Sequence, residues 1–351
     1  MKVWHFKPLD SCFFRGAKSF NQGEGGFLDS QFPPTAQTLA GVIRSTIAEA
    51  KGVNWGLLRK GEQPDIASLI GKNSDDAGAL TFAGPYLYKA GKRLYPVPLH
   101  LLYSEKQQQW TRLQPSETSY VTDMGKRTLP VPVSSIEAAK PVEKAWLDAA
   151  SMQKVLQGGV PDGLMKEASL FSGEARVGIN RDNETKQVEK GLLYFTRHIR
   201  LHEDVSIGMA VDGADDISPA SMVRLGGEAR MAHLTIEDCS DTSLALENRS
   251  DVTRLVLVLI THADFGGKSG PDIDGMRVVS ACIGKAVREG GWDYKNRAPK
   301  PLKSLVPAGS SYFVEFETVN DVTKFLTQKH IGERTAFGYG EVAVGFWSEG
   351  K

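Results

Sequence analysis

Short apolar runs separated by clusters of glycine limit the folds that this chain can adopt. Glycine accounts for 36 of the 351 residues, about 10%, against roughly 7% in an average protein. The longest aliphatic run, residues 255–260, is far too short to cross a bilayer, and the first residues show no signal-peptide pattern. A hydrophobic content of 41% is enough to fill real cores. We therefore expect a soluble, folded protein that is not exported.

The N-terminal part of the chain predicts a strand, a loop and a helix. Residues 3–6 are typical of a short strand. After a glycine-rich loop, apolar residues recur at helical spacing from Leu39 to Ile47, and Thr35 is suited to cap that helix. Residues 52–170 show little sustained periodicity. We expect them to form a long irregular insertion that contains a helix over residues 137–156.

The rest of the chain predicts a series of strands with few helices. Runs over 175–179 and 192–200, separated by turn residues, predict a long hairpin. A short helix at 218–223 and strands at 231–236, 255–260, 276–283, 311–317 and 342–347 follow, with a helix at 319–329. This order predicts an α+β fold of two tandem ferredoxin-like (RRM-like) modules. The N-terminal domain would span residues 1–240, including the insertion at about 52–170, and the C-terminal domain residues 250–351.

Charge is balanced overall but uneven along the chain. Lys+Arg and Asp+Glu both number 42, so nothing global favours binding to a polyanion. Residues 1–60 and 285–303 are nevertheless basic, and residues 211–251 are acidic. A polyanion would therefore have to be held locally. The three cysteines lie far apart without a C-x-x-C pair, which disfavours disulfides and zinc and fits a reducing cytoplasm.

Motifs for other kinds of chemistry are incomplete. Gly266-Gly267-Lys268-Ser269 is similar to a phosphate loop, but His262 stands where its first glycine would be and Gly270-Pro271 disfavours the helix that should follow. Asp272 and Asp274 could hold magnesium, although a turn is the commoner use of two such carboxylates. The histidines have no zinc-ligand spacing, and no G-x-S-x-G motif is present. We expect no metal and no cofactor.

Arginine and aromatic residues beside glycine are typical of RNA-binding loops. Arg15 and Lys18 precede a helix N-terminus, where backbone N–H groups attract phosphate. Near the other end, Arg334 is followed by Gly338-Tyr339-Gly340. These glycines would let the backbone approach a phosphate or a base, and Tyr339 offers a ring for stacking. The alternative is a tight turn with a core aromatic residue.

The order of these motifs resembles that of a known family. Pro8-x-Asp10-x-x-Phe13-Phe14-Arg15-Gly16, followed by Ser30-x-Phe32-Pro33-Pro34-x-x-x-Thr38-x-x-Gly41-x-x-Arg44, is similar to the opening of the third Cmr subunit of type III-B CRISPR effector complexes. Later segments agree in order, namely Gly84-Pro85, Gly173-Glu174-Ala175-Arg176, Gly226-Gly227-Glu228-Ala229-Arg230 and Gly338-Tyr339-Gly340. One departure is Ala36, where the family usually has proline. The resemblance covers most of the chain.

This resemblance implies a RAMP-superfamily protein of the Cas-five type that is not an enzyme. Such a subunit holds the repeat-derived 5′ tag of the guide RNA (crRNA), and docks the large Cas-ten-type subunit and the backbone RAMP subunit of the Cmr complex. A single-stranded tag is held through its phosphates and by base stacking. The resemblance assigns phosphate contacts to Arg15, Lys18, Arg44, Arg176, Arg230 and Arg334, stacking to Phe32 and Tyr339, and close backbone approach to Gly226, Gly227, Gly338 and Gly340.

Two other functions stay open on the sequence. A guide-processing endoribonuclease of the same superfamily could use His5, His233 or His262 as a base without a metal, but no companion catalytic residue is evident. A phosphate-loop nucleotide-binding enzyme is disfavoured by the missing glycine. Cleavage of RNA by the isolated chain would indicate the first, and tight ATP binding the second.

Overall fold

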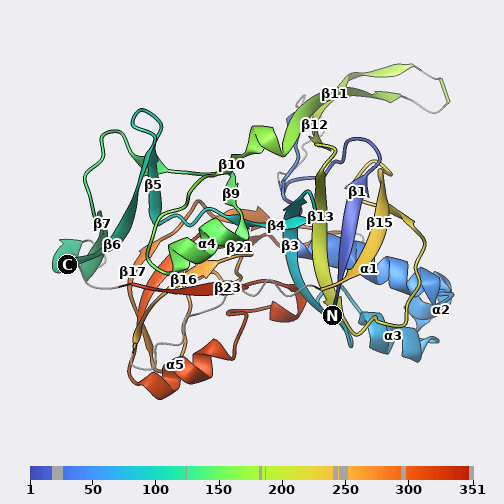
Figure 1. Cartoon of the computed structure of the whole chain (residues 1–351). Coiled ribbons are helices and arrows are strands. Elements are labelled where there is room, and N and C mark those ends of the chain that lie inside the picture. Colours follow the sequence, from blue (N-terminus) through green and yellow to red (C-terminus); the bar gives the residue numbers. More distant parts are fainter. Residues whose placement is uncertain are drawn as a thin grey trace. The chain divides into compact units, whose positions relative to one another are not determined.

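A computed structural model describes residues 1–17, 27–122, 125–181, 184–185, 187–239, 244, 252–293 and 298–347. They form a mixed α+β structure that is rich in antiparallel strands (Figure 1). The chain divides into two compact units, each built from separate stretches. The first comprises Met1–Gly91, Ala168–Cys239 and Arg288–Lys303, and the second comprises Lys92–Glu167, Ser240–Val287 and Ser304–Lys351. The units are therefore interleaved along the chain, and do not follow one another as the domains expected from the sequence would. No helix in the described ranges is long and apolar enough to cross a membrane.

Antiparallel strands around β1 form the core of the first unit. They lie in the order β3-β13-β1-β15-β14. Their bounds are Thr81–Lys89 for β3, Val205–Asp212 for β13, Lys2–Pro8 for β1, Met231–Asp238 for β15 and Met222–Arg224 for β14. Trp4 and Phe6 on β1 are at most 1% exposed, as expected for a central strand covered by other elements. The helix expected at 218–223 is wrong, because residues 222–224 pair with β15 instead.

Helix α1 (Ala36–Ala50) confirms the first predicted helix. The Thr35 side chain accepts a hydrogen bond from the Thr38 N–H and so caps it. Leu39, Ile43 and Ile47 are fully buried, which is the apolar face that the spacing predicted. Two short helices follow, α2 (Trp55–Lys60) and α3 (Pro64–Ile70).

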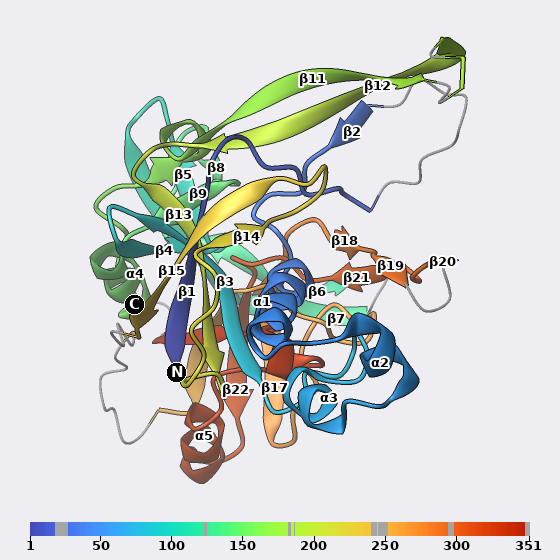
Figure 2. The same ribbon diagram turned by 90° about the vertical axis from the view of Figure 1, so that its right-hand side faces the viewer.

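A three-stranded sheet projects from the first unit. Strand β12 (Val188–Leu201) pairs with β11 (Phe171–Arg181) as a long antiparallel hairpin, and with β2 (Phe27–Asp29) in parallel. Both views show the hairpin extending beyond β1, β13 and β15 (Figures 1 and 2). The predicted hairpin is therefore confirmed, and it is longer than the two apolar runs suggested.

The second unit contains a four-stranded antiparallel sheet in the order β17-β22-β16-β23. Its strands are β16 (Arg254–Leu259), β17 (Met276–Cys282), β22 (Ser311–Phe316) and β23 (Val342–Phe346). Helix α5 (Val319–Leu326) contributes Val322 and Phe325 to the core of this sheet. All four strands and the helix lie where the sequence predicted them.

The stretch expected to be irregular contains many strands. Strands β5 (Leu101–Ser104), β6 (Gln109–Thr122), β7 (Gly125–Pro132) and β8 (Lys140–Pro141) form one sheet. Strands β4 (Lys92–Pro96), β9 (Ala145–Leu147) and β10 (Met165–Lys166) lie in another. The helix expected at 137–156 is α4 (Ala149–Leu156), because Asp148 caps it by accepting from the Ser151 N–H.

The remaining elements are short. They are η1 (Glu167–Ser169), β18 (Val287–Glu289), β19 (Trp292–Asp293), β20 (Ala298–Pro299), β21 (Lys303–Leu305) and η2 (Thr335–Phe337).

Candidate nucleic-acid interface

Three arginines surround one aspartate at the base of the projecting hairpin. Asp10 lies in the bend that follows β1. Its Oδ1 is 2.6 Å from Arg200 Nη2 on β12, and its Oδ2 is 3.1 Å from Arg176 Nη2 on β11 and 3.3 Å from Arg230 Nη1 before β15. Hydrogen bonds from Arg200 and Arg176 lower the pKa of Asp10 to about 2. We call Asp10, Arg176, Arg200 and Arg230 the arginine cluster.

Two glutamates hold the same arginines from other directions. Glu174 lies 2.7 Å from Arg176 and 2.6 Å from Arg200. Glu228 lies 3.6 Å from Arg230 and 3.1 Å from Nε2 of His198. His198 is fully buried, and burial lowers the pKa of His198 although Glu228 opposes the shift. With His198 neutral, the three arginines are balanced by three carboxylates.

The strand register sorts the residues of the three-stranded sheet onto two faces. Across the three strands, Arg176 of β11 pairs with Thr196 of β12, which pairs with Leu28 of β2. Ser30, two residues after Leu28, forms a β-bridge with Arg15. Residues two apart share a face, so Arg15 is on the same face as Arg176. Arg15 is exposed. The opposite face carries Val177, Phe195 and Phe27 in one row, 63%, 37% and 52% exposed.

The Gly226-Gly227 loop packs against the protein itself. A Cβ on Gly226, which has a φ of +79°, would lie 2.5 Å from the Phe13 carbonyl oxygen. The Gly227 N–H donates to the same oxygen at 2.7 Å. These glycines therefore allow a close approach to the backbone of Phe13. Their effect is to bring Glu228 and Arg230 to the arginine cluster.

Arg44, which the resemblance assigns to a phosphate, stabilises a loop in the structure. Its Nε donates to the Ile70 carbonyl oxygen and its Nη2 donates to the Asn73 carbonyl oxygen, the latter at 2.6 Å. The guanidinium thereby caps the end of α3 and holds the loop that follows. The helical spacing of the sequence gives no sign of this neighbour.

The C-terminal Gly338-Tyr339-Gly340 segment is a buried turn, in which the Tyr339 ring is not exposed for stacking on RNA. Tyr339 is 0% exposed, and the Arg334 guanidinium lies 4.1 Å from the centre of its ring. Arg334 donates from Nε to Asp264 at 2.8 Å, and its side chain is 11% exposed. Gly338 and Gly340, with φ of +92° and +71°, serve the turn itself. The alternative from the sequence, a tight turn with a core aromatic residue, describes this segment.

Two further predicted residues complete the comparison. Phe32 is half-buried and packs edge-on against Phe171, with ring centroids 4.5 Å apart. Lys18 lies outside the described residues. The structure thus brings Arg176 and Arg230 together and places Arg15 on the same face as Arg176. Sequence reasoning missed Arg200, Glu174 and the role of Asp10, because the register of β11 against β12 and the position of the bend after β1 bring them together.

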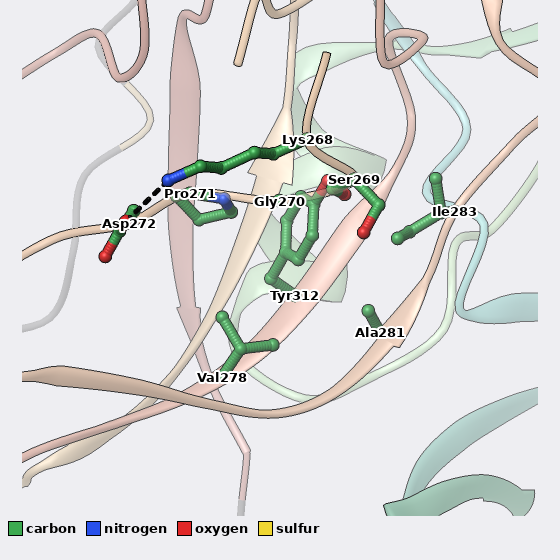
Figure 3. A pocket seen from close by; sticks show the side chains of 9 residues that line it. All are labelled: Lys268, Ser269, Gly270, Pro271, Asp272, Val278, Ala281, Ile283 and Tyr312. Carbon is green, nitrogen blue, oxygen red and sulfur yellow. Dashed lines mark hydrogen bonds and ion pairs between the residues drawn. The ribbon is translucent and has the colours of Figure 1, made fainter. Parts of the chain in front are cut away.

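The segment similar to a phosphate loop has another role. Lys268 forms an ion pair with Asp272 at 2.8 Å, and the Tyr312 hydroxyl donates to the Ser269 carbonyl oxygen. The chain then continues into strand β17 without the helix that a phosphate loop requires. A cavity of about 350 Å³ beside this loop is lined by Tyr312, Val278, Ala281 and Ile283, with Lys268 extended toward Asp272 (Figure 3). The phosphate-loop alternative is therefore wrong. No group of metal-ligand side chains occurs among the residues described.

The fold is similar to that of chains in type III CRISPR effector structures. One is a chain of type III-B Cmr-beta bound to cognate target RNA and AMPPnP, with a TM-score of 0.52 and 16% identity over 93% of this chain and 88% of that one. Another is a chain of Cmr-beta bound to cognate target RNA, with a TM-score of 0.52 and 15% identity over 97% and 96% of the two chains. This chain therefore has a fold of the class found in type III-B Cmr-beta subunits.

The family follows from the sequence match. The family model described as "CRISPR-associated protein (Cas_Cmr3)" matches residues 4–347, so this chain belongs to the Cas_Cmr3 family. No curated protein matches the chain. Family and fold together indicate a subunit of a type III CRISPR effector complex. The resemblance drawn from the motifs is thereby confirmed.

Proposed function

We propose that this chain is a non-catalytic guide-RNA-binding subunit that holds the repeat-derived 5′ tag of the crRNA. The arginine cluster is the observation that carries this proposal, because it gathers three guanidiniums from three separate elements at the base of a projecting hairpin. Arginine suits phosphate because its planar fork of N–H groups matches the phosphate oxygens. The similar Cmr-beta chains come from complexes bound to target RNA, which supports an RNA-binding context.

The exposed Arg15 lies on the same face of the three-stranded sheet as Arg176 and adds a positive charge to that face. Phosphate contacts fix the position of an RNA strand without reading its sequence. Preference for the tag would then come from contacts to its bases. Because net charge is zero, electrostatic attraction to RNA has to come from local positive charge of this kind.

The order of the strands supports two tandem ferredoxin-like modules. One set of four neighbouring strands has the order β3-β13-β1-β15, and the other has the order β17-β22-β16-β23. When the strands of each set are numbered along the chain, both sets have the order 2-3-1-4. Helix α1 follows the first strand of one set, and α5 follows the third strand of the other. A β-α-β-β-α-β unit has helices at these two positions. Each set therefore matches that unit with one of its helices in place.

Two of the histidines that the endoribonuclease alternative could use as a base have partners in the structure. The Nδ1 atom of His262 accepts a hydrogen bond from the Ala308 N–H at 2.9 Å. Burial lowers the pKa of His5, with Glu237 opposing the shift. If the isolated chain cleaves repeat RNA specifically, and His5→Ala or His233→Ala abolishes the cleavage, the endoribonuclease alternative is correct.

The experiment that tests the proposal is co-expression with the neighbouring genes and sequencing of the RNA that copurifies. The proposal expects RNA whose 5′ ends begin with a common repeat-derived tag. It also expects the large Cas-ten-type subunit and a backbone RAMP subunit to copurify, since the chain would bridge them. Bound RNA with random 5′ ends would contradict the tag-holding role.

A further inference from the structure

The arginine cluster has the geometry of an anion site that is already filled. Three guanidiniums approach one carboxylate, with Asp10 oxygens 2.6 to 3.3 Å from Arg200, Arg176 and Arg230. They come from β12, β11 and the loop before β15, so the folding of three distant segments is needed to assemble them. Carboxylate and phosphate oxygens accept the same hydrogen bonds from a guanidinium. A phosphodiester group therefore suits the position that the Asp10 carboxylate occupies.

The arginines keep other partners when Asp10 is removed. Glu174 contacts both Arg176 and Arg200, and Arg176 also donates to Ser11 Oγ at 2.8 Å. Arg230 keeps Glu228, which also lies 3.1 Å from Nε2 of the buried His198. Loss of Asp10 would therefore leave the guanidiniums oriented but with one positive charge in excess.

The net charge of the arginine cluster decides whether it attracts a phosphate. With Asp10, Glu174 and Glu228 in place, the cluster is neutral, and an approaching phosphate gains no net attraction. If Asp10 moves away, the excess of one positive charge matches the single negative charge of a phosphodiester. Asp10 is the acid best able to move, since it lies in a bend and its side chain is 45% exposed, against 33% for Glu174 and 35% for Glu228. Exposed ion pairs are weak, each changing an equilibrium by less than about fivefold.

We propose that Arg176, Arg200 and Arg230 form one phosphate subsite for single-stranded RNA, and that Asp10 fills it until RNA displaces it. The proposal rests on the RNA-binding function above and makes it more specific. Asp10 lowers the affinity for RNA in this scheme. Its removal strengthens binding, which is the opposite of what the loss of a positioning residue would do.

The test measures binding of a fluorescein-labelled single-stranded oligouridylate to the full-length chain by fluorescence anisotropy. Oligouridylate suffices because phosphate contacts do not depend on base sequence. The Asp10→Asn variant keeps the shape of the side chain and removes its charge. The matched control is Asp216→Asn, which removes one exposed carboxylate of the same unit away from the cluster. Circular dichroism melting of each variant checks the fold, and Asp10→Ala provides a second removal of the carboxylate.

We expect Asp10→Asn to bind RNA between about threefold and tenfold more tightly than wild type, as the loss of three exposed ion pairs allows. Asp216→Asn should change the affinity by much less. The gain should vanish in the Asp10→Asn/Arg176→Ala double variant, because the subsite is then incomplete. If Asp10→Asn binds RNA no more tightly than wild type does, this inference is overturned, and the proposed function still stands. Absence of RNA binding by the wild type, and by the same chain within its complex, would instead refute the proposed function.

Discussion

His100 is held neutral in the core of the second unit, which makes the stability of the protein depend on pH. The residue is 4% exposed, its Nδ1 lies 2.9 Å from Ser311 Oγ, and its ring packs edge-on to Phe313. Burial, with a smaller effect of Arg112, lowers the pKa of His100 from 6.5 to about 3. Unfolding exposes the imidazole to water and restores its ordinary pKa.

The size and sign of the effect follow from proton binding. Between these two pKa values the unfolded chain holds one more proton on His100 than the folded chain, so acid favours unfolding. The slope is about 1.4 kcal/mol per pH unit. Lowering the pH from about 7 to about 5 should therefore remove about 2 kcal/mol of stability through this residue alone. Glutamine cannot be protonated, so His100→Gln should lack this loss, whatever its stability at neutral pH.

Urea unfolding of the full-length chain at both pH values, followed by tryptophan fluorescence, measures the difference. Wild type should lose about 2 kcal/mol more than His100→Gln on acidification. Other histidines are common to both proteins and cancel in the comparison. His233→Gln, at an exposed histidine of the first unit, is the control for the exchange of histidine for glutamine. Equal losses in wild type and His100→Gln, or an imidazole NMR signal of His100 that titrates near pH 6.5, would refute the reasoning.

Three substitutions test the roles that the structure assigns to predicted site residues. Gly340→Val should lower the melting temperature strongly, because a Cβ there lies 1.8 Å from the Ile331 carbonyl oxygen at a φ of +71°; an unchanged melting temperature would contradict this. Tyr339→Ala should cost about 3 to 5 kcal/mol by opening a core cavity, and loss of RNA affinity at unchanged stability would show that the ring is accessible after all. Arg44→Ala should cost about 1 to 3 kcal/mol by removing the hydrogen bonds to the Ile70 and Asn73 carbonyl oxygens, and it should not alter the salt dependence of RNA binding, whereas a flatter salt dependence would support its assignment to a phosphate.

Elements with local signals could be predicted from the sequence. Helix α1 has both an apolar face and a capping threonine, Thr35, within a few residues of each other. The β11–β12 hairpin has two apolar runs around a turn-rich segment. In the stretch from β3 to β9, by contrast, prolines obscure the alternation. The hairpins of β5, β6 and β7 are local, but β3 pairs with β13 and β4 with β9, and no local pattern specifies such distant partners.

The candidate site could be predicted only in part, because it depends on register. Glu174 and Arg176 are two residues apart and share a strand face, but Arg200 joins them only through the pairing of β11 with β12. The sequence shows Asp10 as part of a motif, but it does not predict that Asp10 contacts three arginines. Glycines gave the least specific signal. Gly226 and Gly340 both lie at positive φ against a backbone carbonyl of the protein itself, and sequence alone does not distinguish this from an approach to RNA.

The salt dependence of guide-RNA affinity tests the central claim most directly. The measurement compares wild type with the Arg176→Ala/Arg230→Ala double variant, using crRNA that carries its 5′ tag. Arg277→Ala is the control, since Arg277 is 70% exposed and pairs with Glu315 in the second unit. If the cluster binds one phosphate, the double variant should bind more weakly, with a plot of log affinity against log salt that is flatter by about 0.7, and Arg277→Ala should match wild type. Identical slopes and affinities for all three proteins would contradict the claim that the arginine cluster binds RNA.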